Sequence, residues 1–289
     1  MPELPEVEVV KRSLNKKVQN LIIKKVKIND GRLRYTVNKK EVRKIIGLKL
    51  KKIKRRSKFL IFFFNRDIVM LVHLGMTGKF FFVNQKSIKY KTSFYYDING
   101  NKDKKYDRLV FYFNKNQKLV YNDVRKFGFI KFFNNKNLNE NFHINQLGPE
   151  PLKKDFNYIY FKRYISGKNR MIKDILMDQK FVSGLGNIYA NEILFLSKIK
   201  PTRKVDNLKN FELKKIVKLT KIILNSSIKR GGSSIKDFSS SNGKKGSFQE
   251  HFKVYGKKGE SCSNINCENK IIKTKICNRA TFYCSKCQE

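Results

Sequence analysis

The chain begins MPELPEVE, and its first residues after the initiator have side chains and backbone groups suited to covalent chemistry. Removal of Met1 would leave the imino nitrogen of Pro2 beside the carboxylate of Glu3. A terminal secondary amine attacks a sugar C1′ to give a cationic iminium directly. It also titrates far below a lysine, so a useful neutral fraction exists at neutral pH. The alternative is a plain helix start, because Pro and Glu suit the first turn. On these residues alone, the helix start is the stronger interpretation.

A second set of reactive side chains lies at the other end of the chain, where all five cysteines follow residue 260. Four residues separate Cys262 from Cys267, two separate Cys284 from Cys287, and sixteen lie between the pairs. Two such knuckles can close one tetrahedron around zinc, and four thiolates leave no position for water, so the site would be structural. Clustered cysteines in a reducing compartment favour metal over disulfides. Cys277 is left over as a packed small hydrophobe, a free thiol or a substitute ligand, and we favour the first.

Composition indicates the class of partner. The 289 residues include 65 Lys+Arg and 23 Asp+Glu, a formal net charge of +42, which favours a polyanion such as nucleic acid. The alternative is A+T-rich coding, since the chain is also crowded with Asn, Ile and Phe. With 40% hydrophobic residues, the chain has enough apolar material for two or three domains with their own cores.

No segment predicts export or a membrane span. The N-terminus carries Glu3, Glu6 and Glu8 where a signal peptide has basic residues, and the apolar run 59–64 is far too short to cross a bilayer. We therefore expect a cytoplasmic protein with no membrane partner.

The elements that must position these groups follow from apolar spacing. Val7, Val10, Leu14 and Val18 recur at helical spacing, so a helix would hold Pro2 and Glu3 at its exposed start. Segments rich in Phe, Tyr, Ile and Val then predict strands of a two-sheet sandwich at 48–54, 59–64, 68–74, 79–83, 93–98, 106–113, 117–122 and 127–133. The motif LGPEP at 147–151 ends this pattern. Beyond it, the spacing predicts helices at 155–166, 171–180, 187–197 and 208–229.

A helix start and an arginine later in the chain suit contacts with a phosphate, and a basic stretch lies between them. In GLGNIYANE at 184–192 the glycines allow a tight double turn, and Asn187 would begin the next helix, whose N–H groups and dipole favour an anion. An ordinary helix corner capped by Asn is the alternative. The Gly- and Ser-rich stretch 230–246 predicts a mobile basic loop or a plain linker. Arg279, between the knuckles, would press its guanidinium onto a phosphate or be an ordinary surface arginine.

Together these segments resemble one family, the bacterial formamidopyrimidine-DNA glycosylases, which remove oxidised purines and cleave the abasic strand. The resemblance runs from end to end. Its motifs are MPELPEVE, RRSKFLIF (55–62), HLGMTG (73–78), DVRKFG (123–128), LGPEP, GLGNIYANE, GGSSIKDF (231–238), VYGKKGE (254–260) and RATFYCSKCQ (279–288).

The resemblance implies an α+β fold with four parts. These are an N-terminal catalytic β-sandwich with a flanking helix (1–147), a helix–two-turn–helix DNA-binding domain (152–232), a flexible basic loop and connector (233–252), and a zinc-finger β-hairpin (253–289). It also implies damaged double-stranded DNA as the partner, one structural zinc ion per chain and no catalytic cofactor. A monomer associated with the bacterial nucleoid through DNA would suffice.

Catalytic roles carry over onto four residues. Pro2 would attack C1′ of the damaged nucleotide, and Glu3 would donate a proton during base loss and sugar-ring opening. The residues matching Lys58 and Arg279 donate protons as elimination expels the 3′ and then the 5′ phosphate, and a cation there also stabilises the departing charge. Without the motif, Lys58 would be one more solvated basic side chain.

Other matched positions imply DNA contacts. Family enzymes evert the damaged base and fill the gap with side chains, here Met76, Arg125 and Phe127; unstacking costs a few kcal/mol, which an aromatic and a thioether partly offset. The remaining DNA-binding positions are His73, Tyr106, Arg125, Lys168, Asn187 and Lys236. Without the motifs, Met76 and Phe127 would be core residues.

Several residues depart from the family pattern. Tyr106 stands where a DNA-contacting His is common, Val124 and Lys126 where Pro and Arg are usual, and the first knuckle has four intervening residues where two are usual. Two alternative functions stay open. One is an endonuclease-VIII-like glycosylase for oxidised pyrimidines, against which Leu4, Met76 and Phe127 argue. The other is a non-catalytic zinc-finger DNA-binding protein, for which the N-terminal residues would be superfluous.

Overall fold

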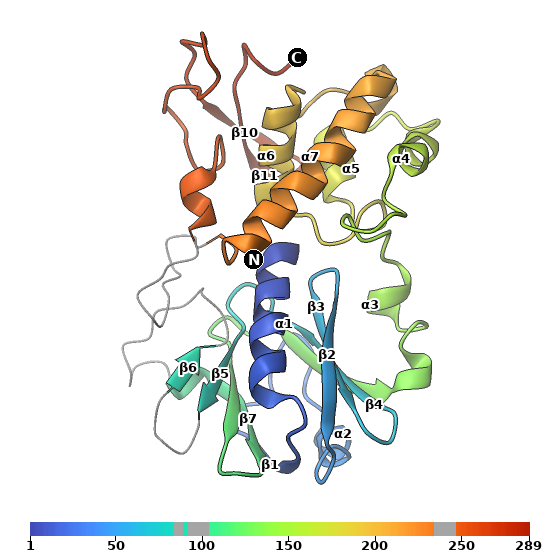
Figure 1. Cartoon of the computed structure of the whole chain (residues 1–289), viewed down its shortest axis with the longest axis vertical. Helices are drawn as coiled ribbons and strands as arrows, with labels where there is room; N and C mark the ends of the chain where they lie inside the picture. The colour runs from blue at the N-terminus through green and yellow to red at the C-terminus, as the bar shows by residue number, and fades with distance from the viewer. Residues whose placement is uncertain (84–88, 92–103, 234–246) are drawn as a thin grey trace. The chain divides into compact units, whose positions relative to one another are not determined.

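The structure is a computed structural model and describes residues 1–83, 89–91, 104–233 and 247–289 (Figure 1). Its contacts divide the chain into two compact units. The first is Met1–Asn145 together with Arg230–Gln249, and the second is Gln146–Lys229 together with Glu250–Glu289. Among the described residues, no helix combines the length and the apolar character needed to cross a bilayer.

Helix α1 (Leu4–Val18) opens the first unit and runs beside strands β2 and β3 (Figure 1). The four apolar residues expected on its inner face are all buried. The expectation of an exposed start is wrong, because Pro2 is buried and Glu3 is only 3% exposed. The reason is a local hydrogen-bond network in which Glu6 accepts the backbone N–H of Glu3 at 2.8 Å and both the N–H and the hydroxyl of Ser233.

Two antiparallel sheets follow and share one hydrophobic core, so the expected β-sandwich is confirmed. The first sheet has the order β1-β7-β8-β5-β6, with bounds β1 Ile23–Ile28, β5 Lys79–Val83, β6 Lys89–Lys91, β7 Asp107–Phe113 and β8 Lys118–Asn122. The second sheet has the order β2-β3-β4-β9, with bounds β2 Leu50–Arg56, β3 Phe59–Phe64, β4 Ile68–His73 and β9 Phe129–Asn134.

Seven of the eight expected strands match strands of these sheets to within two residues, and the eighth, 93–98, lies outside the described residues. Strand β1 was not expected. Its sequence IKKVKI carries three lysines, and it pairs only with β7 at the edge of its sheet, so one row of its side chains faces solvent. The short helix α2 (Lys39–Arg43) was also missed, although the Asn38 side chain caps it by accepting the backbone N–H groups of Lys40 and Glu41.

The second unit holds the four expected helices and the finger hairpin. Their bounds are α4 Tyr158–Ile165, α5 Ile172–Met177, α6 Asn187–Ser197, α7 Asn210–Lys229, β10 Ile272–Ile276 and β11 Arg279–Tyr283. The remaining short elements are distributed over both units. They are α3 Phe142–Asn145 and the 3₁₀ turns η1 Lys104–Tyr106, η2 Asn135–Asn137, η3 Val205–Asn207 and η4 Phe248–His251. The finger packs on α6 through a shared apolar cluster that includes Phe195 and Phe282.

Candidate active site and metal centre

Two loops of the first unit touch through their backbones and form one surface. One loop, 74–77, joins β4 to β5, and the other, 123–128, joins β8 to β9. A Cβ atom on Gly75 would clash with the backbone of Phe127 and Gly128, and Gly75 itself has a left-handed φ of 60°. Only glycine allows so close an approach at such a φ. The motifs HLGMTG and DVRKFG therefore meet in space.

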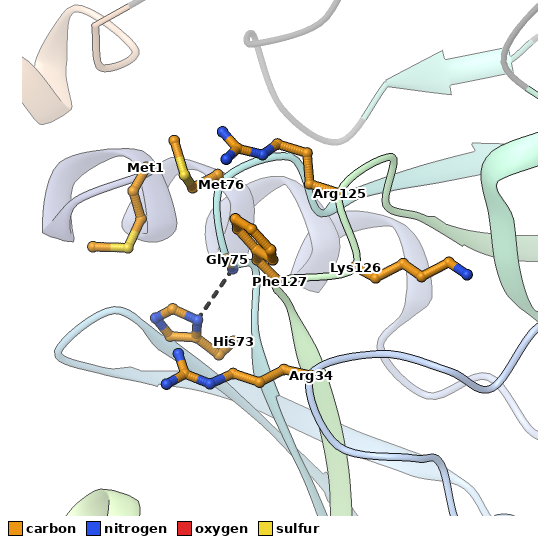
Figure 2. Close-up of a pocket in the computed structure, with 8 residues that line it drawn as sticks. All are labelled: Met1, Arg34, His73, Gly75, Met76, Arg125, Lys126 and Phe127. Atoms are coloured by element: carbon orange, nitrogen blue, oxygen red, sulfur yellow. Dashed lines mark hydrogen bonds between the residues drawn. The ribbon is translucent and has the colours of Figure 1, made fainter.

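The surface bounds a cavity of about 620 Å³ (Figure 2). Its lining residues are Met1, Arg34, His73, Gly75, Met76, Arg125, Lys126 and Phe127. Met76 is 37% and Phe127 46% exposed, which is unusual for large apolar side chains. The guanidinium carbon of Arg125 lies 4.6 Å from the centroid of the Phe127 ring. The three expected void-filling side chains thus gather at one cavity, beside the start of the chain.

The N-terminal amine lies among charged groups of the same unit. Burial lowers the pKa of the Met1 amine, Lys58 and Arg125 lower it further, and Glu3 and Glu6 oppose the shift. The Lys58 side chain is itself only 6% exposed. The structure therefore brings the start of the chain, Glu3 and Lys58 into one electrostatic cluster, although far more buried than an exposed helix start would be.

Lys58 is positioned by a tight hairpin turn. Ser57 and Lys58 are the two residues between β2 and β3, and Ser57 is buried with a left-handed φ of 55°. Arg55 donates to the carbonyl oxygen of Ser57 at 2.9 Å and pairs with Glu8 of α1 at 3.0 Å. Through Arg55, the turn that carries Lys58 is tied to the helix that follows the N-terminus.

His73 is held in its neutral form. Its Nδ1 accepts the backbone N–H of Gly75 at 3.1 Å, and its ring stacks on Phe129 with centroids 5.6 Å apart. Burial lowers the pKa of His73 to about 4, and Lys58 and Arg34 add to the shift. Because Nδ1 is an acceptor, the proton belongs on Nε2, which makes this ring a neutral N–H donor at the cavity.

In the second unit, Arg279 is exposed and is the first residue of β11. The preceding residues, Cys277 and Asn278, form the two-residue turn after β10, with left-handed φ values of 49° and 56°. Positive φ at both positions is the pattern of the tight hairpin turn that matches strand twist. Cys277 is exposed at this turn, so the preference for a packed hydrophobe was wrong.

Side chains of α5 and α6 form hydrogen bonds with strand β11 of the hairpin. Asn187, the first residue of α6, donates from Nδ2 to the carbonyl oxygen of Ala280 at 2.8 Å. Lys173 donates to the hydroxyl of Thr281 at 2.5 Å, and Asn191 accepts the N–H of Phe282 at 2.9 Å. Burial lowers the pKa of Lys173 to about 8. Sequence reasoning placed Asn187 at this helix start but missed Lys173 and Asn191, because no local pattern marks their partners about a hundred residues away.

The turns between α5 and α6 have the expected double form. Gly184 has a left-handed φ of 97°, and its N–H donates to the side-chain oxygen of Gln179 at 2.8 Å. The amide nitrogen of Gln179 donates to the carbonyl oxygen of Leu185 at 2.8 Å. One partly buried side-chain amide therefore fixes the path that leads into Asn187.

The other expected DNA contacts are placed as follows. Tyr106 ends η1, with the Lys105 ammonium 4.9 Å from its ring centroid. Lys168 follows α4, with its ammonium 4.8 Å from the ring of Tyr164. Lys236 lies outside the described residues.

The four knuckle cysteines converge on one point. All four sulfur atoms lie within 4.8 Å of one another, with Cys262 and Cys287 at 3.8 Å and Cys267 and Cys284 at 3.7 Å. Thiolates about 2.3 Å from a tetrahedral zinc would be separated by about 3.8 Å. The cluster therefore has the donor set and the size of a closed four-thiolate metal site, and the stretched first knuckle does not prevent it.

Comparisons with known proteins agree over the whole chain. The family model described as the formamidopyrimidine-DNA glycosylase N-terminal domain matches residues 1–130, and the corresponding H2TH domain model matches residues 147–239. Formamidopyrimidine-DNA glycosylase of Rickettsia bellii (strain OSU 85-389) is 38% identical over 289 residues, covering 100% of both chains. That of Rickettsia massiliae (strain Mtu5) is 38% identical over 288 residues, covering 100% of this chain and 97% of its own.

Solved structures give the same answer. A complex between Lactococcus lactis Fpg and DNA containing an abasic site matches with a TM-score of 0.86 and 33% identity, covering 99% of each chain. A complex of the wild-type Lactococcus lactis protein with DNA containing an oxidised pyrimidine matches with a TM-score of 0.85 and 32% identity, covering 100% of each chain. The chain belongs to the formamidopyrimidine-DNA glycosylase family.

Proposed function

We propose that this chain excises oxidised purines, such as 8-oxoguanine and formamidopyrimidines, from duplex DNA through a Schiff base on Pro2. As a family member it is a DNA glycosylase with AP lyase activity that acts in base excision repair. The supporting observation is that the N-terminal amine lies among the buried residues Glu3 and Lys58, and that partial burial and cationic neighbours lower the pKa of the Met1 amine. A lowered pKa leaves more of an amine neutral and able to attack.

The proposed chemistry begins once Met1 has been removed. The Pro2 nitrogen forms a bond to C1′, the glycosidic bond to the base breaks, and Glu3 donates a proton as the base leaves and the sugar ring opens. The resulting iminium acidifies the C2′ proton, whose loss expels the 3′ phosphate; a second elimination expels the 5′ phosphate. Lys58 and Arg279 are the proposed proton donors for these departures.

Side chains at the cavity are proposed to replace the everted nucleotide in the stack. Met76 and Phe127 supply apolar surface, and Arg125 supplies donors for the orphaned partner base. His73, Tyr106, Lys168, Asn187 and Lys236 are the proposed phosphate and loop contacts. His73 suits this role because its neutral ring has an N–H on Nε2 that can donate to a phosphate oxygen.

The metal proposed for the cysteine site is zinc, because four thiolates in a tetrahedron are the donors it prefers, with one ion per chain. A fully coordinated ion would hold the hairpin that presents Arg279 and would take no part in the reaction. No catalytic cofactor is needed for Schiff-base chemistry. We propose that the protein acts as a monomer on damaged duplex.

The test is borohydride trapping on duplex DNA containing 8-oxoguanine opposite cytosine. The processed wild-type protein should give a covalent adduct, and Glu3→Gln should lose excision of the base while still trapping DNA that already carries an abasic site. Because a solved relative was crystallised with an oxidised pyrimidine, the lesion panel should include one. Absence of any wild-type adduct on both substrates would refute the Pro2 mechanism. Faster excision of pyrimidines than of purines would overturn the proposed specificity.

A further inference from the structure

We propose that Thr77 and Asp123 are positioning residues that lock the two loops at the cavity into one rigid wedge. We call residues 74–77 and 123–128 the wedge loops, because they carry Met76, Arg125 and Phe127. The proposal rests on the proposed function, in which those three side chains fill the gap left by an everted nucleotide. It adds two residues that no motif assigned and that do not themselves line the cavity.

Hydrogen bonds join the two loops through buried groups. The Thr77 hydroxyl donates to Oδ1 of Asp123 at 2.5 Å and accepts the backbone N–H of Arg125 at 3.0 Å. The second oxygen of Asp123 accepts the N–H of Gly128 at 2.8 Å. Asp123 is 0% exposed, so its carboxylate, which accepts from Thr77 and Gly128, is shielded from competing water. One hydroxyl and one carboxylate thus fix both ends of the segment that holds Arg125 and Phe127.

The loops also have no room to shift toward one another. A Cβ atom on Gly75 would strike the backbone of Phe127, and one on Gly128 would strike the hydroxyl of Tyr121 and Oδ2 of Asp123. The two loops therefore meet backbone against backbone, and the Asp123 carboxylate lies against Gly128. Loss of the Thr77 hydroxyl or of the Asp123 carboxylate would therefore release a contact that fixes the wedge loops.

A second set of contacts holds the outer side of the same loop. Arg108, 5% exposed, donates to the carbonyl oxygen of Asp123 at 2.8 Å and to Asp30 at 2.9 Å. Asp30 also pairs with Lys126 at 2.8 Å, and Lys126 has a left-handed φ of 58°. Figure 2 shows Lys126 pointing away from Met76 and Phe127. The turn at Lys126 therefore sends its ammonium toward Asp30, away from the wedge side chains of Arg125 and Phe127 on either side of it, although all three residues line the cavity.

Rigidity of the wedge loops matters only where a stacked nucleotide must be displaced. Unstacking a paired nucleotide opposes eversion, and inserted side chains offset that cost only if they are already in position. A single strand that carries an abasic site has no base to evert and no partner base to support. Loss of the Thr77–Asp123 hydrogen bond should therefore slow excision from duplex DNA and leave cleavage of the single strand unchanged.

The test compares Thr77→Val, which keeps the shape and removes the hydroxyl, with Thr77→Ser, which keeps the hydroxyl. Single-turnover excision of 8-oxoguanine opposite cytosine should fall by about tenfold in Thr77→Val, the size expected for one lost buried hydrogen bond, and stay within about twofold of wild type in Thr77→Ser. Cleavage of a single-stranded abasic oligonucleotide should change by less than about twofold in either variant. The fluorescence of a 2-aminopurine placed beside the lesion, which rises as stacking is lost, should increase more slowly on mixing with Thr77→Val than with the wild-type protein.

A matched control separates this effect from general destabilisation. Ser227→Ala removes a hydroxyl from a buried bond with Tyr189 in the second unit and should leave the ratio of the two activities unchanged. Asp123→Ala, which removes the acceptors of both Thr77 and Gly128, should lower that ratio at least as far as Thr77→Val does. Equal losses on both substrates, or wild-type excision by Thr77→Val, would overturn the proposal. A wild-type protein that forms no borohydride adduct would instead overturn the proposed function.

Discussion

At the scale of single residues, the first unit gathers groups whose chemistry depends on one another. Pro2 and Glu3 are buried, and burial, with Lys58 and Arg125, lowers the pKa of the Met1 amine. His73 is kept neutral by the same unit, with its pKa lowered to about 4. Both shifts favour uncharged nitrogen at physiological pH. More of the Met1 amine is thereby neutral, and the His73 ring can donate a hydrogen bond from Nε2.

The pH dependence of Schiff-base formation should report this environment. We expect the surroundings that lower the pKa of the Met1 amine to act on the Pro2 nitrogen once Met1 is removed. Lys58→Met removes a cation that lowers the amine pKa, so that pKa should rise and the trapping rate near neutral pH should fall by about threefold. Lys58→Arg keeps the charge and should hold the wild-type midpoint. The measurement is the rate of borohydride trapping on preformed abasic DNA from pH 5.5 to 8.5, a range spanning roughly the ordinary titration of a terminal amine. Identical midpoints for both variants would contradict this electrostatic account.

At the scale of elements, α5 and α6 hold the finger hairpin through side chains rather than through sheet pairing. Asn187, Lys173 and Asn191 each bond to β11 or its start. A lysine with 0% exposure is unusual, because burial penalises its charged form. The hairpin position that presents Arg279 therefore depends on an ammonium that sits close to its titration point.

Stability against pH should reveal this buried lysine. The folded pKa of Lys173 is lowered to about 8 from the ordinary 10.5, so between those values the unfolded chain binds more protons than the folded chain. Stability relative to Lys173→Met should then rise with pH across that window, by up to about 3 kcal/mol. The measurement is denaturant unfolding of both proteins at several pH values in that window. A difference that stays flat or falls as pH rises would show that Lys173 titrates like an exposed lysine.

Local pattern predicted most of these elements, and its failures have physical reasons. The strands from 59–64 and 79–83 and the helix at 187–197 were predicted with their bounds, because their buried faces are continuous and apolar. Strand β1 was missed because an edge strand needs few apolar residues.

The site residues divide in a similar way. Motif resemblance identified Met76, Arg125 and Phe127, and the structure brings them to one cavity. Thr77 and Asp123 lay inside the quoted motifs but received no role, because their bonds join segments 46 residues apart. The burial of Pro2 and Glu3 depends on Ser233, which is more than two hundred residues away. No local pattern could have predicted it.

At the scale of the whole molecule, the chain has a net charge of +42, and two of its regions are stabilised in different ways. In the sandwich, one hydrophobic core supports both sheets and α1. Among the described residues, the apolar cluster that joins the finger to α6 has six buried members, two of them cysteines, so the thiolates carry much of the structure. The two regions should therefore respond differently to metal removal.

Metal analysis should find one zinc ion per chain, bound by the four clustered cysteines. Cys284→Ser should lose the ion and weaken DNA binding by at least about tenfold, since the hairpin that carries Arg279 would lose its tether. Cys277→Ser, which changes the exposed cysteine of the turn, should keep both the ion and the affinity. Equal metal loss in the two variants would contradict the four-cysteine assignment.

The central claim is that the unblocked imino nitrogen of processed Pro2 forms the covalent bond to damaged DNA. The most direct test is peptide mapping by mass spectrometry after borohydride reduction with 8-oxoguanine duplex. We expect the sugar fragment on the N-terminal peptide that begins at Pro2, with Met1 absent. An adduct mapped to a lysine side chain, or an adduct on a chain that retains Met1, would contradict the account.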